Sequence, residues 1–340
     1  MIKKIFIFIL AMSVMMASLS YVASAKSKMS KVKLSKKSIT LYEAPNYTYA
    51  VAKIKVLNAS SQKDYLFEYG CTNDELYVDC ELKNSNKTIL ITTHNIGKGT
   101  LSLYLDGKEF AVKINVKKLK FNKDSIVMAK GSKNKIKIVS GPKKAKWHYT
   151  KKKIVTVSKK GVVKAKKVGN TIAYIKTSGG YAGCAISVVS KKLYKVIKEA
   201  RRIAKGTYDS DRRMQDKFYD EASLIWRAYA KQKMFLVNKK TAPNLDELYE
   251  YYSARTNKQI KGGLTETNTK KMKFRPGDLY FNNPNDNMDI GSSTNVIVDG
   301  VEMFAGYEVN SMSSPKDYLV LPKWITKEDD YGFKGMVIRP

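Results

Sequence analysis

The hydrophobic residues of this 340-residue chain recur with two different periods, each in its own part of the chain. Between residues 27 and 192, apolar and polar residues alternate in short runs that are separated by Gly, Asn and Lys. A period of two is the pattern of strands buried on one face, and runs of this spacing are typical of β-sandwiches. No helical period interrupts these residues, so this part of the chain is predicted to be all-β.

The all-β part contains an internal repeat. Residues 34–41 (LSKKSITL) open the first copy, and residues 121–128 (FNKDSIVM) open the second. Near the ends of the copies, residues 99–103 (GTLSL) correspond to residues 170–174 (NTIAY). Such a repeat predicts two copies of one sandwich fold. The two copies occupy residues 27–117 and 118–192.

The pattern changes to a helical period at Leu193. Amphipathic stretches cover residues 193–204 and 221–231, and a third follows Pro243. After a Pro-Gly turn at residues 276–277, short apolar runs typical of strands take over. These runs lie at residues 279–281, 295–298, 303–305, 318–321 and 336–338. Helices followed by strands predict an α+β domain over residues 193–340.

The N-terminus has the pattern of a secretory signal. Lys3 and Lys4 precede an apolar run over residues 5–16, and Ala23-Ser24-Ala25 forms a small-residue cleavage site. Residues 1–25 are therefore predicted to be a signal peptide. No later apolar run is long enough to span a bilayer, so no transmembrane segment is expected after cleavage. The mature chain is expected to be secreted, either extracellular or associated with the cell wall.

Positive charge concentrates in the second copy. Residues 118–192 hold 21 lysines and a single acid, Asp124, in a chain of net charge +33. Closely spaced ammonium groups attract polyanions because binding releases condensed counterions. The expected partner is an anionic wall polymer or membrane surface; nucleic acid is unlikely, because Lys lacks the planar fork of Arg. A solvated lysine face without a ligand is the alternative. The candidate residues are Lys143, Lys144, Lys146, Lys151, Lys152, Lys153, Lys159 and Lys160.

Cysteines and histidines are few. Cys71 and Cys80 lie nine positions apart across a predicted turn and are a candidate disulfide in an exported chain; two free thiols are the open alternative. Cys184 is expected in a buried strand. His94 and His148 are single imidazoles, whereas a metal site needs three or four converging ligands. No metal and no cofactor are therefore predicted.

Four segments of the second copy follow one another in a defined order. A Trp strand is followed by a hairpin of two Val-rich segments and then by a Gly-x-Thr-x-Ile-like strand. These are residues 147–149, 154–157, 160–165 and 168–172. This order resembles the bacterial Ig-like domain of group 2. The first copy departs from it, with residues 67–69 at the Trp strand and residues 79–81 in the hairpin. The resemblance implies a stalk, spacer or adhesive module.

Four motifs of the C-terminal part keep the order of one enzyme family and also its spacing, apart from a two-residue shortfall between the last two motifs. They are YDEASLIWRAY at residues 219–229, RPGDLYF at 275–281, STNV at 293–296 and MFA at 303–305. They resemble motifs of the NlpC-type peptidases, papain-like enzymes that cut peptidoglycan stem peptides. The resemblance implies an α+β papain-like fold after the two all-β sandwiches.

The catalytic positions of that family are vacant. The nucleophilic Cys aligns with Glu221, the general base with Asn295, and the residue that orients the base with Ala305. Residues 193–340 also contain no Cys and no His, so neither Cys/His nor Ser/His/Asp chemistry can be built from this domain alone. The resemblance therefore implies an inactive peptidase that binds peptide in its cleft, a binding protein without enzymatic activity. Its cleft would be lined by Tyr219, Asp220, Ser223, Trp226 and Asn295.

Two other interpretations stay open. A hydrolase with relocated chemistry would pair Glu221 with a second carboxylate such as Asp278 or Glu302. Against this, Asp220 can cap a helix on which Glu221 meets the positive end of the dipole. A purely structural adhesin, in which residues 193–340 form only a compact cap, is the third interpretation.

Overall fold

The structure is a computed structural model of the whole chain. The predicted signal peptide lies outside the residues that it describes. These are residues 32–43, 49–60, 65–73, 75–177, 180–238, 240–261, 271, 273–281, 296–298, 301–303, 308–312, 318–321 and 336–340. Among them, no helix is long and apolar enough to cross a bilayer.

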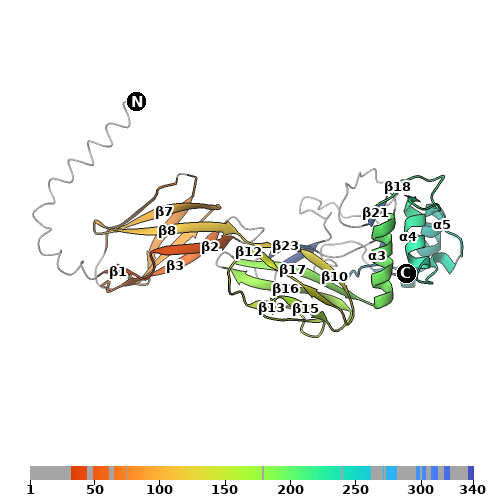
Figure 1. The fold of residues 1–340 in the computed structure, drawn as a ribbon, viewed down its shortest axis with the longest axis horizontal. Coiled ribbons are helices and arrows are strands. Elements are labelled where there is room, and N and C mark those ends of the chain that lie inside the picture. The colour runs from red at the N-terminus through yellow and green to blue at the C-terminus, as the bar shows by residue number, and fades with distance from the viewer. Residues whose placement is uncertain are drawn as a thin grey trace, which may run out of the picture. The chain divides into compact units, whose positions relative to one another are not determined.

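The first copy is a sandwich of two four-stranded sheets (Figure 1). Alternate residues of its strands are buried, as the period of two predicts, and Ile54, Ile89, Ile91 and Leu101 are fully enclosed between the sheets. One sheet has the order β1 (Lys33–Leu34), β3 (Ala50–Leu57), β6 (Thr88–Thr93), β5 (Val78–Lys83). The other has the order β2 (Ser38–Glu43), β8 (Lys108–Lys118), β7 (Gly97–Leu105), β4 (Phe67–Cys71).

The second copy repeats this topology, which confirms the predicted repeat. Its larger sheet has the order β10-β17-β16-β13, the counterpart of β2-β8-β7-β4, with β10 parallel to β17. Its other strands form the sheet β11-β15-β14 and the pair β12-β9. The strands are β9 (Lys120–Phe121), β10 (Ser125–Ala129), β11 (Lys133–Lys135), β12 (Ile138–Ser140), β13 (Trp147–Tyr149), β14 (Val155–Val157), β15 (Val162–Ala165), β16 (Gly169–Thr177) and β17 (Gly180–Val189).

One strand differs between the copies. In the first copy, β3 is continuous and pairs with β6 and then with β1. In the second copy its counterpart is divided into β11, which pairs with β15, and β12, which pairs with β9. Ile136 and Lys137 lie at the division. The sequence pattern gave no indication of this break.

Three helices follow the second sandwich, where the helical period predicts them. α3 begins two residues before the predicted stretch because the Ser190 side chain caps it, and α3 and α4 lie side by side (Figure 1). Buried Leu224, Ile225 and Tyr229 join α4 to the core. The elements are α3 (Lys191–Ile203), β18 (Thr207–Tyr208), β19 (Phe218–Tyr219), α4 (Glu221–Ala230), η1 (Leu236–Asn238), α5 (Leu245–Ser253) and η2 (Thr256–Lys258).

Short strands complete this region. The antiparallel sheet β21-β22-β20-β25 lies against α4 through β22, and β23 pairs with β24. Of the strand predicted at residues 303–305, Met303 belongs to β22 and residues 304 and 305 lie outside the described residues. The strand β23 was not predicted. Their bounds are β20 (Leu279–Phe281), β21 (Val296–Val298), β22 (Val301–Met303), β23 (Glu308–Met312), β24 (Tyr318–Leu321) and β25 (Met336–Ile338).

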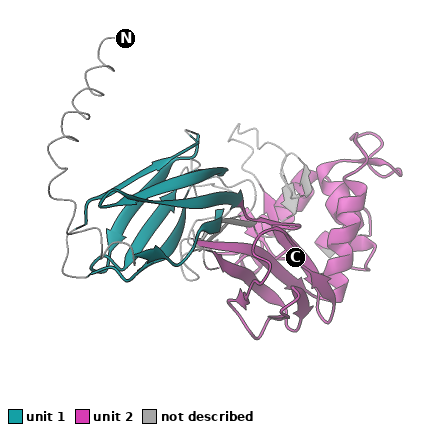
Figure 2. Cartoon of the chain, turned by 60° about the vertical axis from the view of Figure 1, so that its left-hand side comes forward, with its two compact units in different colours: residues 1–43, 48–117 teal, residues 44–47, 118–340 magenta. Residues whose placement is uncertain are grey.

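Two compact units divide the chain at Lys117, where the boundary between the sandwich copies was predicted (Figure 2). The second unit holds both the second sandwich and the helical region, so residues 192 and 193 are not separated by a break in packing. Val189 of β17 belongs to the hydrophobic core of the helices, and Val127 of β10 packs against that core. β23 also lies against β17. The fold is therefore mostly β, with Ig-like sandwiches and a small helical region.

Candidate functional site

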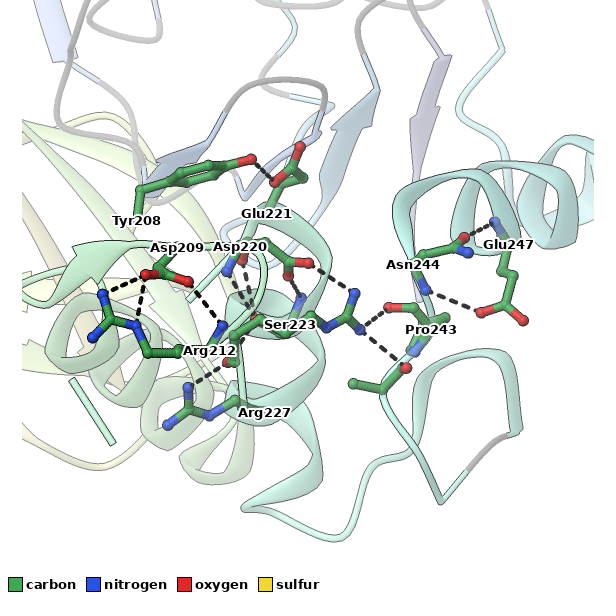
Figure 3. A network of polar contacts seen from close by, with 12 residues as sticks. Tyr208, Asp209, Arg212, Asp220, Glu221, Ser223, Arg227, Pro243, Asn244 and Glu247 are labelled. Atoms are coloured by element: carbon green, nitrogen blue, oxygen red, sulfur yellow. Dashed lines mark hydrogen bonds and ion pairs between the residues drawn. The ribbon is translucent and has the colours of Figure 1, made fainter. Parts of the chain in front are cut away.

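The start of α4 is the position at which the peptidase resemblance places a nucleophile. Asp220 is the N-cap, as predicted: its Oδ1 accepts a hydrogen bond from the Ser223 amide at 2.6 Å, and the Asp220 amide donates to Ser223 Oγ at 3.0 Å. This reciprocal pair is a capping box. Glu221 opens the helix and accepts a 2.8 Å hydrogen bond from the Tyr208 hydroxyl (Figure 3). The carboxylate at Glu221 is thus held by ordinary helix-end chemistry.

Arg213 connects this helix start to the segment before α5. Its guanidinium donates to Asp220 Oδ2 at 2.7 Å and to the carbonyl oxygens of Ala242 at 3.1 Å and Pro243 at 2.6 Å. Arg227, in the last turn of α4, also donates to the carbonyl of Arg213, at 3.0 Å. Because a guanidinium presents a rigid fork of donors, these bonds fix two loops around the helix start. The network is structural.

Three of the residues expected to line a cleft are buried instead. Ser223 is 0% exposed, while Asp220 and Trp226 are each 7% exposed. Asp220 and Ser223 are engaged in the cap, and Trp226 belongs to the hydrophobic core, where it meets Phe235. Tyr219 is half-buried, edge-on to Tyr208. The predicted cleft role is wrong for Ser223 and Trp226, because the apolar face of α4 is turned into the core.

The other aligned positions, Asn295 and Ala305, lie outside the described residues. The strands next to them are paired, with Val296 opposite Met303. The vacancy of the catalytic positions therefore rests on the sequence.

Asp278, one of the two acids considered for relocated chemistry, is held by other groups. Its carboxylate is 2% exposed and accepts hydrogen bonds from Arg339 Nε at 2.8 Å, from Arg339 Nη2 at 2.7 Å and from the Arg275 amide at 2.7 Å. Burial raises the pKa of the Asp278 carboxyl, and the Arg339 guanidinium opposes that shift. This carboxylate locks the turn between Arg275 and Asp278. The Glu302 side chain is not among those described.

The cysteines and histidines form no metal site within the described residues. Cys71 and Cys80 are free thiols rather than a disulfide, and both pack against the core of the first sandwich. Cys184 is buried in β17, as predicted. His94 pairs with Asp79 at 2.7 Å, and His148 stacks on Tyr174. Both imidazoles have structural contacts with protein side chains.

The second sandwich carries a dense cationic surface. All 21 lysines of residues 118–192 are exposed, including the eight candidates, and none forms an ion pair with another described residue. Asp124, the one acid of this segment, is exposed as well. Salt bridges are found in the first sandwich and in the helical region. Without ion-pair partners among the described residues, these ammonium groups are available to an external anion.

Part of this surface surrounds a pocket of about 480 Å³. We call it the lysine pocket. Its rim carries Lys135, Lys137, Lys143, Lys159 and Lys160, and its lining includes no acidic residue. Three of these lysines were among the eight candidates. Lys135 and Lys137 were missed because the strand break that brings them to the rim has no signal in the sequence.

Apolar residues line the lysine pocket together with the lysines. Trp147, Ile136, Val139, Pro142 and Ala145 contribute to its lining. Trp147 is half-buried against Phe121, and its indole N–H meets no acceptor among the described residues. The pocket thus combines five ammonium groups with an aromatic ring and one unused hydrogen-bond donor.

Comparisons with known proteins identify no family. No family model matches the chain, and no curated protein matches it. Among solved structures, a 282-residue C-terminal fragment of intimin, in complex with the intimin-binding domain of its receptor Tir, is 14% identical, with a TM-score of 0.29. That match covers 69% of this chain and 86% of the fragment.

Two further bacterial structures are similar at the same level. Invasin, an integrin-binding protein, is 11% identical with a TM-score of 0.27; the match covers 46% of this chain and only 38% of invasin. Domains 4 and 5 of the S-layer protein SbsC are 18% identical with a TM-score of 0.18, over 36% of this chain and 77% of that one. The function of this chain is argued below from its own residues.

Proposed function

We propose that the chain is an exported surface protein that binds a phosphate-bearing wall polymer through the lysines of its second sandwich and does not cut it. The observation that carries the proposal is the set of 21 exposed lysines without ion-pair partners among the described residues, beside a single acid. Like charges at this density repel each other in the free protein. A polyanion relieves the repulsion and loses condensed counterions when it binds.

The class of polyanion follows from the side chains and from the N-terminus. The excess consists of Lys alone, which acts as a point charge toward phosphate, and contains no Arg fork for reading base edges. The N-terminal pattern of Lys3, Lys4 and the Ala23-Ser24-Ala25 site supports export. An exported cationic surface first meets the anionic polymers of the cell wall.

The test is a binding measurement on the full mature chain. Binding to poly(glycerol phosphate) is expected to weaken steeply between 50 and 200 mM salt, on the order of tenfold or more, and neutral dextran is expected not to bind. Replacing Lys151, Lys152 and Lys153 by Gln is expected to weaken binding about tenfold. The matched control replaces Lys33, Lys36 and Lys37 of the first sandwich, removing the same charge, and should stay within twofold.

Two results would overturn the proposal. One is binding that does not change with salt. The other is an equal loss in both triple variants, since this would make net charge, and not the second sandwich, the determinant. Tighter binding to double-stranded DNA or to anionic vesicles than to the phosphate polymer would reassign the ligand class.

A second candidate function concerns the helical region, which we propose to be a peptidase-like domain without catalysis. It is supported by α4, which starts at Glu221 and lies against the antiparallel strand β22, and by the lack of Cys and His in residues 193–340. The full chain is expected to release no soluble fragments from peptidoglycan while still sedimenting with it. Release that disappears in Glu221→Gln would instead establish carboxylate chemistry.

A further inference from the structure

The lysine pocket lies at the break in the divided strand. At this point Ile136 still donates to the carbonyl of Gly161 at 3.0 Å, in the turn between β14 and β15. Lys137 instead bonds to Asn122, which lies on the other side of the divided strand. The Lys137 amide donates to Asn122 Oδ1 at 2.7 Å, and the Asn122 amide donates to the Lys137 carbonyl at 3.0 Å. Neighbouring residues therefore pair with different strands, and the sheet parts between them.

The first sandwich provides an internal comparison. There, β3 runs unbroken over Ala50–Leu57 and passes directly from β6 to β1. The first sandwich thus has the same topology with this sheet undivided. The break beside the pocket is therefore a feature of the second copy alone among the described sandwich strands. It coincides with the copy that carries the lysines.

The volume of the lysine pocket limits what it can hold. At about 480 Å³ it falls within the ~300–1,000 Å³ range of small-molecule sites. A bare phosphate ion would leave most of this space to water. The five rim ammonium groups and the lack of an acidic lining residue require a ligand with negative charge. The ligand is thus an anionic group attached to a larger body.

The non-lysine residues of the pocket lining indicate the chemistry of the uncharged part of the ligand. A delocalised cationic patch would need only the exposed lysines. Here, half-buried Trp147 offers part of an aromatic ring and an indole N–H without an acceptor among the described residues, beside the exposed apolar side chain of Val139. A sugar or polyol presents both C–H faces that pack on a ring and hydroxyl oxygens that accept from an indole N–H.

We propose that the lysine pocket is a discrete subsite for one phosphate-bearing sugar or polyol unit. Its rim lysines hold the phosphate, and Trp147 holds the sugar or polyol. This inference rests on the proposed function, because the ligand of the pocket is a single repeating unit of the same anionic polymer. The lysines outside the pocket, such as Lys151, Lys152 and Lys153, then contribute only long-range attraction.

The experiment uses small ligands that cannot span the cationic surface. Binding of N-acetylglucosamine 1-phosphate and glycerol 3-phosphate to the full mature chain is measured by calorimetry, beside inorganic phosphate and neutral N-acetylglucosamine. Saturable binding with one site is expected for the two phosphate esters, at least tenfold tighter than for inorganic phosphate. Neutral sugar is expected to show no binding. Circular dichroism confirms that each variant is folded.

Matched variants separate the pocket from the surface around it. Replacing Lys143, Lys159 and Lys160 by Gln is expected to weaken phosphate-ester binding at least tenfold. Replacing Lys151, Lys152 and Lys153 removes the same charge and is expected to change it less than twofold, although it weakens polymer binding. Trp147→Phe keeps a ring, removes the N–H and is expected to weaken ester binding severalfold.

The outcomes distinguish this inference from the proposed function. If the chain binds poly(glycerol phosphate) but no phosphate ester, the subsite is wrong and polymer binding stands. Equal losses in the two triple variants, or inorganic phosphate binding as tightly as the esters, would also refute the subsite. If the chain binds neither polymer nor ester, both proposals fail. Binding of anionic vesicles that survives in the Lys143, Lys159 and Lys160 variant would place lipid phosphate elsewhere on the surface.

Discussion

The side-chain amide of Asn170 donates a 2.7 Å hydrogen bond to the main-chain carbonyl of Phe274, across 104 residues of sequence. Both residues are buried. Asn170 belongs to β16 of the second sandwich, and Phe274 precedes the turn that Asp278 and Arg339 hold in the helical region. This bond is one reason why the second sandwich and the helices form a single compact unit.

Asn170→Ala is expected to destabilise the second unit by about 1–3 kcal/mol, because a buried carbonyl loses its donor. Lys167→Ala, at an exposed neighbouring position, is the control and should change stability by less than about 0.5 kcal/mol. Urea unfolding is followed by the fluorescence of Trp147, in the sandwich, and of Trp226, among the helices, each in a background that keeps only that tryptophan. The two probes are expected to coincide, since the sandwich and helices share a core. Separate transitions for sandwich and helices would contradict this coupling.

Arg213 and its neighbour Arg212 allow a paired test of burial. Arg213→Ala leaves the buried Asp220 carboxylate without its guanidinium and frees two carbonyls, so a loss of about 3 kcal/mol or more is expected. Arg212 pairs with Asp209 at the surface, and Arg212→Ala is expected to cost less than about 1 kcal/mol. Thermal unfolding compares the two. Equal losses would show that the network around the start of α4 contributes no more than a surface ion pair.

Cys80 is expected to resist alkylation in the folded protein. Burial raises the pKa of its thiol to about 12, with the Asp79 carboxylate adding to the shift. At pH 8 only about one Cys80 in ten thousand is then a thiolate, the reactive form. Iodoacetamide at pH 8 followed by peptide mass mapping should find Cys80 unmodified until urea unfolds the chain. Rapid labelling without urea would contradict the burial of this thiol.

The same shift predicts a direction for stability against pH. The folded state holds the Cys80 proton more tightly than the unfolded state does, so this contribution is complete below the ordinary thiol pKa and is lost as the pH rises toward 12. The difference in stability between wild type and Cys80→Ala is therefore expected to shrink between pH 8 and pH 10.5. A difference that grows over this interval would have the wrong sign.

Gly161 is required by the turn that closes the lysine pocket. Its φ is +75°, and a Cβ there would lie 2.2 Å from the carbonyl oxygen of Ile136. Gly161→Ala is expected to cost more than about 2 kcal/mol, the left-handed conformation alone accounting for about 1–2 kcal/mol. Gly131→Ala is the control, because Gly131 has φ +88° but open space around its Cα. Thermal unfolding of the two variants should separate the clash from the conformational term.

Local patterns in the sequence were sufficient for most elements. Alternation predicted strands such as β6 and β7, whose buried and exposed residues alternate as expected. The Asp220 cap and the helix after it were also predicted, because a cap acts on amides within one turn. Periodicity placed α4 correctly, but it could not show whether a given face of the helix lines a cleft or packs into the core. Ser223 and Trp226 were therefore assigned to a cleft, whereas packing against neighbouring elements buries them.

The sequence by itself determined the repeat, the helices and the concentration of lysines, because each depends on residues close together along the chain. The tertiary structure decided three further features: the divided strand, the lysine pocket at its break and the joining of the second sandwich to the helices. Each depends on which distant segments pair or pack, as Ile136 does with Gly161 and Asn170 with Phe274. Two copies with the same strand pattern thus share a topology, and among the described strands only the second copy divides the strand beside the lysine pocket.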